Sequence, residues 1–193
     1  ETAALSADFL PNDAQIYTVT ENNITIWSID GSTRILDTAD NLQDIAFIPD
    51  TDTLVSLSEH QVALWSSQSG INLNKFPLKE SSNGPILTLN NHSILYSDDT
   101  HLVQRSLKNG QLLHQFPESY GVYKALISDN EKYILSLSED GVGRLWSTDT
   151  GLKLDDFPDT RDLIFIPQST DFLIAQGHSV NYWEIEVDQV RPT

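Results

Sequence analysis

The side chains best suited to chemistry in this sequence are five histidines and several neighbouring acidic residues. No two histidines stand two or four positions apart, the spacings that would let one strand or one helix face bring two imidazoles to a metal ion. The HExxH motif, the Gly-x-Ser-x-Gly motif of hydrolases and the glycine-rich phosphate loop are also absent. The sequence therefore predicts histidines exposed in turns, and it assigns no catalytic residue, no metal ligand and no cofactor.

Four acidic pairs are the strongest candidates for a cation site, at positions 50 and 52, 98 and 99, 129 and 131, and 155 and 156. Calcium prefers carboxylate oxygens, but none of these pairs lies in a loop of about twelve residues with a central glycine and a terminal glutamate. Aspartate also accepts hydrogen bonds from nearby backbone N–H groups in turns. We expect structural turns at these positions, and a cation-dependent ligand-binding or hydrolytic site remains the alternative.

The balance of charge narrows the class of partner. The 11 Lys and Arg residues stand against 28 Asp and Glu residues, which gives a net charge of −17 at pH 7. Nucleic acids and anionic lipid surfaces are held by clusters of Lys and Arg, so neither is expected as a partner. No apolar run reaches the roughly 18 residues needed to cross a bilayer, so no membrane insertion is expected. Of the partner classes considered, a protein is the one that these properties leave open.

The sequence has no cysteine and no methionine, and it begins at Glu1. The absence of cysteine excludes disulfides and thiolate zinc sites, and it is compatible with either redox compartment. A start other than methionine indicates that a signal or pro-segment was removed, or that the sequence is a piece of a longer chain. Export to the periplasm or the extracellular space and residence in the cytoplasm both fit the sequence.

An internal repeat determines where all these side chains lie. Each unit has an anchor residue that ends a short alternating segment. The anchors are Trp27, Trp65, Arg105, Trp146 and Trp183. The successive spacings between them are 38, 40, 41 and 37 residues. A Phe-Pro pair follows three of the anchors at the same distance, beginning at Phe76, Phe116 and Phe157.

Each unit contains four short runs of β-forming residues separated by turn residues. In the second unit these runs are 45–49, 54–58, 62–66 and 71–76. This order predicts a four-stranded antiparallel meander, and the lack of a sustained 3.6-residue apolar period predicts few and short helices. One such sheet leaves both apolar faces open, so we expect the sheets to stack face to face around an axis.

The period, the strand number and the anchor position resemble the WD-repeat family of β-propellers. The strongest match is the stretch 136–147, in which Ser138-Glu139-Asp140-Gly141 leads through a tight turn into a strand that ends in Trp146. The resemblance implies an all-β propeller of four-stranded antiparallel blades. After its tryptophans the chain has Ser or Glu where the family usually has Asp. Apolar stacking, at roughly 25 cal/mol per Å² of buried apolar area, is therefore expected to hold the blades together.

The identical place of the aromatic residues in each unit favours packing between blades over a ligand cage. The expected structural anchors are Trp27, Trp65, Trp146, Trp183, Phe76, Phe116 and Phe157. The expected blades, within one domain, are residues 1–40, 41–80, 81–120, 121–159 and 160–193. The resemblance implies seven or eight blades. Three interpretations therefore stay open: a fragment of a larger propeller, a five-bladed ring, and an open arc whose exposed sheet faces meet another chain.

In the family, the turns between second and third strands share one rim with the connections between blades, and this rim commonly holds a partner. Transferred by position, the rim comprises Glu59, His60, Lys79, Glu80, Asp98, Asp99, Glu118, Tyr120, Glu139, Asp140, Asp159, Arg161 and His178. Tyr120 and Tyr123 have no counterparts in the other units, and tyrosine is favoured at interfaces.

The sequence therefore predicts a non-catalytic protein-interaction scaffold or assembly module, whose acidic rim favours basic or neutral protein segments. The expected partner is a protein, either the remainder of a larger propeller or a second chain. Two alternatives stay open: a carbohydrate-binding, peptide-binding or hydrolytic propeller, and a sensor or regulatory segment of a multidomain protein.

Overall fold

The computed structural model describes residues 6–10, 15–21, 23–38, 41–48, 51–78, 82–89, 92–98, 100–186 and 189–192. These residues form five antiparallel sheets of four strands each, and no helix occurs among them. Within each sheet the strands lie side by side in sequence order, so each sheet is a meander. We number the sheets blades 1 to 5.

The strands of the five blades are as follows. Blade 1 contains β1 (Ser6–Phe9), β2 (Gln15–Val19), β3 (Asn23–Ser28) and β4 (Thr33–Asp37). Blade 2 contains β5 (Leu42–Phe47), β6 (Thr53–Ser58), β7 (Gln61–Ser66) and β8 (Asn72–Pro77). Blade 3 contains β9 (Ser82–Leu89), β10 (Ser93–Asp98), β11 (Leu102–Ser106) and β12 (Leu112–Phe116). Blade 4 contains β13 (Val122–Ile127), β14 (Tyr133–Ser138), β15 (Gly143–Ser147) and β16 (Lys153–Phe157). Blade 5 contains β17 (Thr160–Phe165), β18 (Phe172–Gln176), β19 (Ser179–Glu186) and β20 (Gln189–Pro192).

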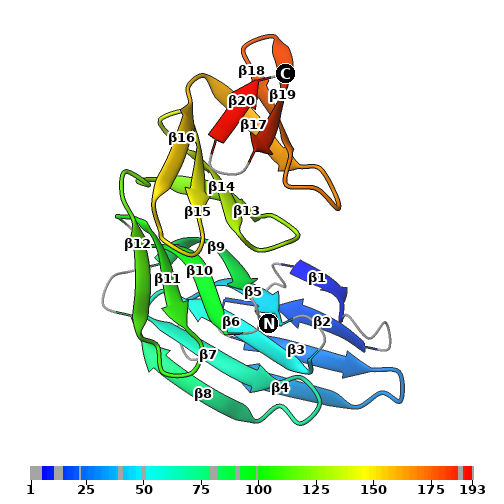
Figure 1. Cartoon of the computed structure of the whole chain (residues 1–193). Coiled ribbons are helices and arrows are strands. Elements are labelled where there is room, and N and C mark those ends of the chain that lie inside the picture. The colour runs from blue at the N-terminus through cyan, green and yellow to red at the C-terminus, as the bar shows by residue number, and fades with distance from the viewer. Residues whose placement is uncertain are drawn as a thin grey trace.

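The blades follow one another along an open arc, with blade 1 at one end and blade 5 at the other (Figure 1). The first strands of blades 2 to 5 contact one another in succession, which places them on the inside of the arc. This is the all-β propeller architecture that the sequence predicts, in an unclosed form. The C-terminal tail supplies the fourth strand of the last blade, because β20 pairs antiparallel with β19.

Each blade has two different faces, because successive residues of a strand point to opposite sides of the sheet. In blade 4, Ile134 and Trp146 pack toward blade 3, whereas Leu135 and Leu145 pack toward blade 5. We call the first side the tryptophan face and the second the forward face. At every contact between successive blades, the tryptophan face of one blade packs on the forward face of the blade before it.

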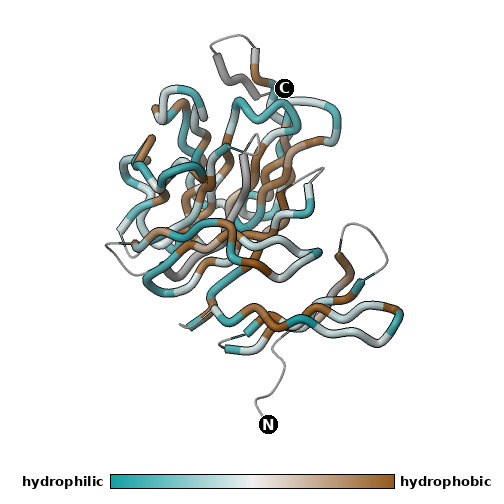
Figure 2. The backbone as a smooth tube through the Cα atoms, turned by 90° about the horizontal axis from the view of Figure 1, so that it is seen from below, coloured by the Kyte–Doolittle hydropathy of each residue, from teal (hydrophilic) through white to brown (hydrophobic). Residues whose placement is uncertain are grey.

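Apolar clusters fill these contacts. Figure 2 shows that the hydrophobic stretches run along the strands and that polar stretches gather at the turns. The largest side chains that are fully buried include Trp146, Tyr96, Phe116, Phe157 and Phe172. Burying a side chain of this size stabilises the fold by about 2 to 3 kcal/mol, so stacking of the blades is the main cohesive interaction.

The anchors of blades 2 to 5 lie between blades. Trp65 and Trp146 are buried, and the ring of Trp183 lies 4.8 Å from that of Phe157 in the preceding blade. In blade 3 the anchor is Arg105, whose Nε donates a hydrogen bond of 2.8 Å to Tyr96 Oη on the same face. The guanidinium therefore occupies the tryptophan position with its polar atom satisfied. Phe76, Phe116 and Phe157 are buried as well.

Trp27 is different, since its side chain is 47% exposed. The prediction that it packs between two blades is wrong for the described residues. The physical reason is its place in the arc: Trp27 lies on the tryptophan face of blade 1, and no described blade covers that face.

The turn between the third and fourth strands presses each blade against its predecessor. In blades 2, 3 and 4 a glycine N–H donates to the serine carbonyl four residues earlier, at Ser66 and Gly70, Ser106 and Gly110, and Ser147 and Gly151. Gly110 has a φ of 70°, and a Cβ atom there would lie 2.6 Å from Phe76 Cγ. Gly151 has a φ of 68°, and its Cβ would lie 2.9 Å from His114 Nδ1. These turns therefore require glycine for both conformation and space.

Candidate interaction rim

Backbone hydrogen bonds assemble one rim of the arc. They join the turn after the second strand of a blade to the connections that flank it. The bonds run from the N–H of Leu42 to Glu21 O, Glu59 to Asn41 O, Leu78 to His60 O, Glu139 to Gly121 O, and Thr160 to Gly141 O, with distances of 2.7 to 3.0 Å. The main chain therefore holds together the loops of blades 1 and 2 and those of blades 4 and 5, and in blade 3 the Leu102 N–H donates to Ser119 Oγ at 2.7 Å.

Two connections on this rim contain the same turn. After the proline that ends each Phe-Pro pair, Glu118 and Asp159 have positive φ angles of 58° and 56°. The next residue, Ser119 or Thr160, is buried, and its hydroxyl donates to the phenylalanine carbonyl three positions earlier at 2.6 Å. The buried hydroxyl closes the turn, and the acidic side chain before it stays exposed at the rim.

The carboxylate of Glu118 is paired with a lysine of the next blade. Lys153 Nζ contacts Glu118 Oε2 and donates a hydrogen bond of 2.8 Å to Asp156 Oδ2. The hydrogen bonds to Asp156 and then to Glu118 raise the pKa of Lys153 above its usual value. This cluster ties the connection after blade 3 to the last strand of blade 4.

Asp140 is occupied in a similar way. Arg144 Nη2 donates to Asp140 Oδ2 at 2.6 Å, and the Val142 N–H donates to Asp140 Oδ1 at 2.9 Å. The hydrogen bond from Arg144 is the main cause that holds the pKa of Asp140 below its ordinary value of 3.8. Arg144 itself is buried, and its Nε lies 3.6 Å from Asp156 Oδ1. Asp140 therefore neutralises a buried guanidinium.

A third ion pair joins blades 4 and 5. Lys124 Nζ lies 2.5 Å from Asp162 Oδ1, and this contact is the main cause that lowers the pKa of Asp162. Sequence reasoning missed Lys124, Arg144 and Lys153. The Lys124 and Asp162 pair spans 38 residues, so no local pattern indicates it. Asp140 and Arg144 are only four residues apart, across a tight turn, so their spacing in the sequence could have indicated this ion pair.

Asp98 does not face outward. Its side chain is buried, and its Oδ1 accepts hydrogen bonds from the N–H of Thr100 at 2.8 Å and of His101 at 2.6 Å. The prediction of a partner-facing Asp98 is wrong, because the carboxylate closes its own turn.

The other predicted rim residues differ in exposure, and three of them lie outside the described part of the chain. Glu59 is half-buried, and its carboxylate accepts a hydrogen bond from Asn41 Nδ2 at 3.3 Å. His60, Glu139, Asp159, Arg161 and His178 are exposed. Lys79, Glu80 and Asp99 lie outside the described residues. The structure therefore presents a mixed rim on blades 3 to 5, where several carboxylates are already paired.

Exposed aromatic residues lie on the same rim. Tyr120 is 60% exposed, and its ring lies 4.8 Å from that of His101, whose Nδ1 is 2.9 Å from Gln115 Nε2. Tyr123 is exposed at a β-bulge where the pairing of β13 with β14 shifts register. Blade 5 has a bulge at the equivalent place, which presents Arg161. The bulges aim these side chains outward from the first strands.

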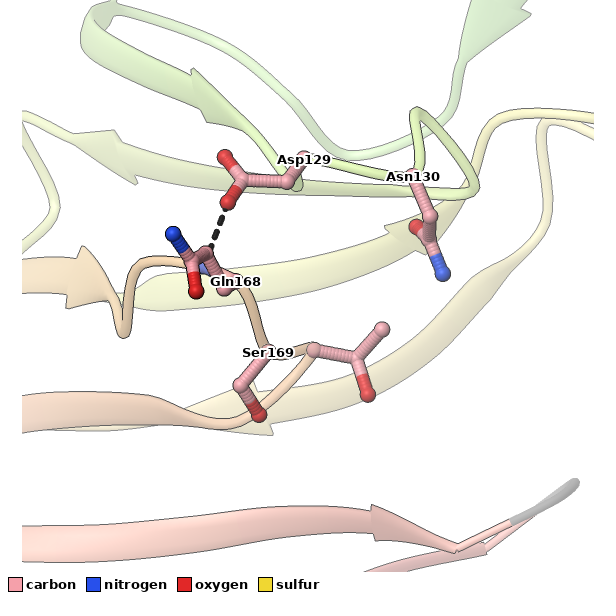
Figure 3. A pocket seen from close by; sticks show the side chains of 5 residues that line it. Asp129, Asn130, Gln168 and Ser169 are labelled. Atoms are coloured by element: carbon pink, nitrogen blue, oxygen red, sulfur yellow. Dashed lines mark hydrogen bonds between the residues drawn. The ribbon is translucent and has the colours of Figure 1, made fainter.

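Two hollows lie at opposite rims. One, of about 250 Å³, is on the candidate rim between blades 1 and 2 and is lined by Glu21, Asn41, Leu42 and Gln43. The other, of about 290 Å³, is on the opposite rim between the first turns of blades 4 and 5. There the Gln168 N–H donates to Asp129 Oδ2, and Asn130 and Ser169 also line the hollow (Figure 3).

Over the described ranges, no group of three or more His, Asp or Glu side chains could hold a metal ion. Within that same part of the chain, no helix has the length and hydropathy needed to span a membrane.

Comparison with known proteins agrees with this geometry. No protein-family model and no curated protein sequence matches the chain. Among solved structures, the chain is similar to the C-terminal WD40 domain of Sif2, with 16% identity and a TM-score of 0.75. The fold is therefore that of a WD40-type β-propeller. The match covers 97% of this chain and 56% of that one, so the five blades span little more than half of the solved domain's length.

Proposed function

We propose that this segment is a non-catalytic protein-interaction scaffold whose rim on blades 3 to 5 holds the partner. WD40 domains generally bind protein partners, which agrees with the fold. The observation that carries the proposal is the part of the rim that main-chain hydrogen bonds tie together from Gly121 to Thr160. It exposes Tyr120, Glu139 and Asp159 from neighbouring loops and Tyr123 from the bulge of β13. Exposed tyrosines on a fixed backbone provide contact area at low entropic cost.

The charge of the chain favours a basic or neutral partner segment. With a net charge of −17, the protein attracts cationic segments from a distance and repels acidic ones. Near the rim, Lys153, Arg144 and Lys124 already neutralise three of the carboxylate positions. Glu139 and Asp159 are therefore the exposed carboxylates best placed to meet a cationic side chain directly.

A short fluorescein-labelled peptide of alternating Arg and Gly tests this proposal by fluorescence anisotropy. Glu139→Lys should weaken its binding by about fivefold or more, and the matched Asp149→Lys change by about twofold or less. Asp149 is a suitable control because it is exposed too but lies on the opposite rim, in the turn after β15. Equal losses in the two variants would show general electrostatic attraction and would contradict a rim site.

The aromatic contribution is tested separately. Tyr120→Ala should weaken binding of the same peptide with little change in its dependence on salt, because a stacked ring contributes through desolvated contact area and not through net charge. Binding that is unchanged in both Tyr120→Ala and Tyr123→Ala would remove the tyrosines from the proposed site.

A further inference from the structure

The third and fourth strands of blades 2 and 3 differ in charge from the rest of the chain. The two stretches that contain them, 60–79 and 100–117, have no Asp or Glu, although the whole chain has 28. The equivalent strands of blades 1, 4 and 5 include carboxylates, as at Asp37, Asp156 and Glu184. A region without acidic side chains therefore lies in the middle of a chain whose net charge is −17.

Apolar side chains are exposed on the fourth strands of these two blades, which lie on the convex side of the arc (Figure 1). Ile71, directly before β8, and Leu73 within it are 62% and 54% exposed. Leu112 and Leu113 in β12 are 43% and 45% exposed. Leu73 and Leu113 are the extra residues at equivalent β-bulges, which leave them out of the strand pairing. The same position of both blades therefore presents a leucine at the surface.

The two fourth strands are joined at this surface. Asn74 Nδ2 of β8 donates hydrogen bonds of 3.2 Å to the carbonyl oxygens of Leu107 and Lys108, in the turn before β12. Gly110 of that turn lies against the Phe76 ring. The exposed side chains therefore belong to one surface, which we call the outer patch. It comprises Ile71, Leu73, Lys75, Lys108, Leu112 and Leu113.

Two lysines give the outer patch a positive charge. Lys75 and Lys108 are both exposed, one on each blade. Asp52 stands at the margin, where its Oδ2 accepts a hydrogen bond of 3.1 Å from Ser66 Oγ. An acidic partner would be repelled by the rest of the chain only at long range, and the Debye length of about 8 Å at physiological salt screens that repulsion. Apolar area and charge together therefore suit a partner segment that is apolar and acidic.

We propose that the outer patch binds an amphipathic helix of a partner protein, whose contacting face carries apolar side chains flanked by Asp or Glu. Its apolar side chains cover the four Ile and Leu residues, and its carboxylates meet the two lysines. A helix is favoured over an added strand because the bulges interrupt the edges of β8 and β12, where a strand would have to pair. A helix satisfies its own backbone and needs only side-chain contacts.

Two other occupants fit this surface less well. A twofold dimer of this chain through the outer patch would place Lys75 and Lys108 against the same lysines of the second copy. It would also bring together two net charges of −17. An anionic membrane is held by clusters of about four to eight basic residues, and the two lysines of the outer patch fall short of that number.

A fluorescein-labelled peptide of about 18 residues is the probe, with Leu along one helical face, Glu on both flanks of that face and Ala elsewhere. Its binding to the complete protein is measured by fluorescence anisotropy, after circular dichroism has verified the β-structure of each variant. Leu113→Ser should weaken binding by about fivefold or more. The matched Leu154→Ser should weaken it by about twofold or less, because Leu154 is the 44% exposed bulge leucine of blade 4, outside the outer patch.

The lysines are tested with a second matched pair. Lys108→Glu should weaken binding of the same peptide by about fivefold or more. Lys132→Glu makes the same change of net charge at an exposed lysine in the first turn of blade 4, and it should weaken binding by about twofold or less.

The absence of saturable binding by the wild type, or equal losses within either pair of variants, overturns the proposal. A dimer that Leu113→Ser dissociates in sedimentation experiments would assign the outer patch to a second copy and overturns it as well. The same holds for binding to phosphatidylserine vesicles that Leu113→Ser abolishes. The interaction rim is tested with a cationic peptide and with other variants, so either proposal can fail without the other.

Discussion

The indole Nε1 of Trp146 donates a hydrogen bond of 2.9 Å to Ser136 Oγ, at a contact between blades 3 and 4 where both side chains are fully buried. Trp27 makes the corresponding bond to Thr18 on the open face of blade 1. The same pair of groups, an indole N–H and a hydroxyl, is therefore present both in the interior and at the surface. Variants at the buried pair and at the exposed pair can therefore separate the contribution of packing to stability from that of the hydrogen bond.

Trp146→Ala should lower the free energy of unfolding by about 3 to 5 kcal/mol, because it leaves a cavity between two blades. Trp27→Ala should lower it by about 1 kcal/mol or less, because its ring is already half exposed. Urea unfolding followed by circular dichroism measures both. Similar losses for the two variants would contradict the assignment of Trp146 to the interior.

Ser136→Ala should cost about 1 to 3 kcal/mol of stability, because the indole N–H of Trp146 is then buried without an acceptor. Thr18→Ala is the matched control and should cost about 0.5 kcal/mol or less, since water replaces the lost acceptor at the exposed Trp27. Urea midpoints of the two variants test this difference. A larger loss from Thr18→Ala would refute it.

Gly110→Ala should destabilise the fold by about 2 to 4 kcal/mol, through a left-handed backbone conformation and overlap with the Phe76 ring. Gly141→Ala separates these causes, because Gly141 has a φ of 73° but nothing within 4 Å of the added Cβ. It should cost about 1 kcal/mol. Thermal unfolding of both variants measures the effect. Equal decreases in their unfolding temperatures would mean that the overlap with Phe76 does not destabilise the fold.

Stability should also fall in acid through Asp140. Its folded-state pKa is lowered, chiefly by Arg144, so its contribution is complete above the unfolded pKa and disappears as the pH falls through the folded one. The side chain is 47% exposed, so solvent screening limits this contribution to about 1 kcal/mol.

The variant Asp140→Asn should therefore be less stable than the wild type near neutral pH, and the difference should shrink as the pH falls below about 4. Urea midpoints measured across this range provide the test, with the exposed neighbour Glu139→Gln as the control. A difference that grows in acid would have the wrong sign for the proposed pairing.

The repeat made most of the fold predictable. The anchor spacing located the third strand of each blade, and it identified Arg105 as an anchor although its chemistry differs from that of tryptophan. The structure explains this tolerance, because Tyr96 on the neighbouring strand accepts the hydrogen bond of Arg105. A period in the sequence is sufficient here because every blade solves the same packing problem.

The properties of individual rim residues were less predictable, because they depend on contacts that the period does not encode. Whether Trp27 is buried depends on a neighbouring sheet and not on its own segment. Asp98 is of a residue type common in exposed turns, but its carboxylate is buried and accepts hydrogen bonds from backbone N–H groups of its own turn. Lys153 and Glu118 are 35 residues apart, so their pairing follows only once two blades stand side by side.

The fixed orientation of the blades has a consequence for synthesis. Each tryptophan face rests on the blade that precedes it in the chain, so a blade leaving the ribosome finds its docking surface already formed. If the blades assemble in order from the amino terminus, the apolar tryptophan face of each new blade is covered as soon as the blade forms. A ribosome stalled after blade 3 should therefore hold protease-resistant blades 1 and 2, whereas resistance acquired only after release of the whole chain would exclude such stepwise growth.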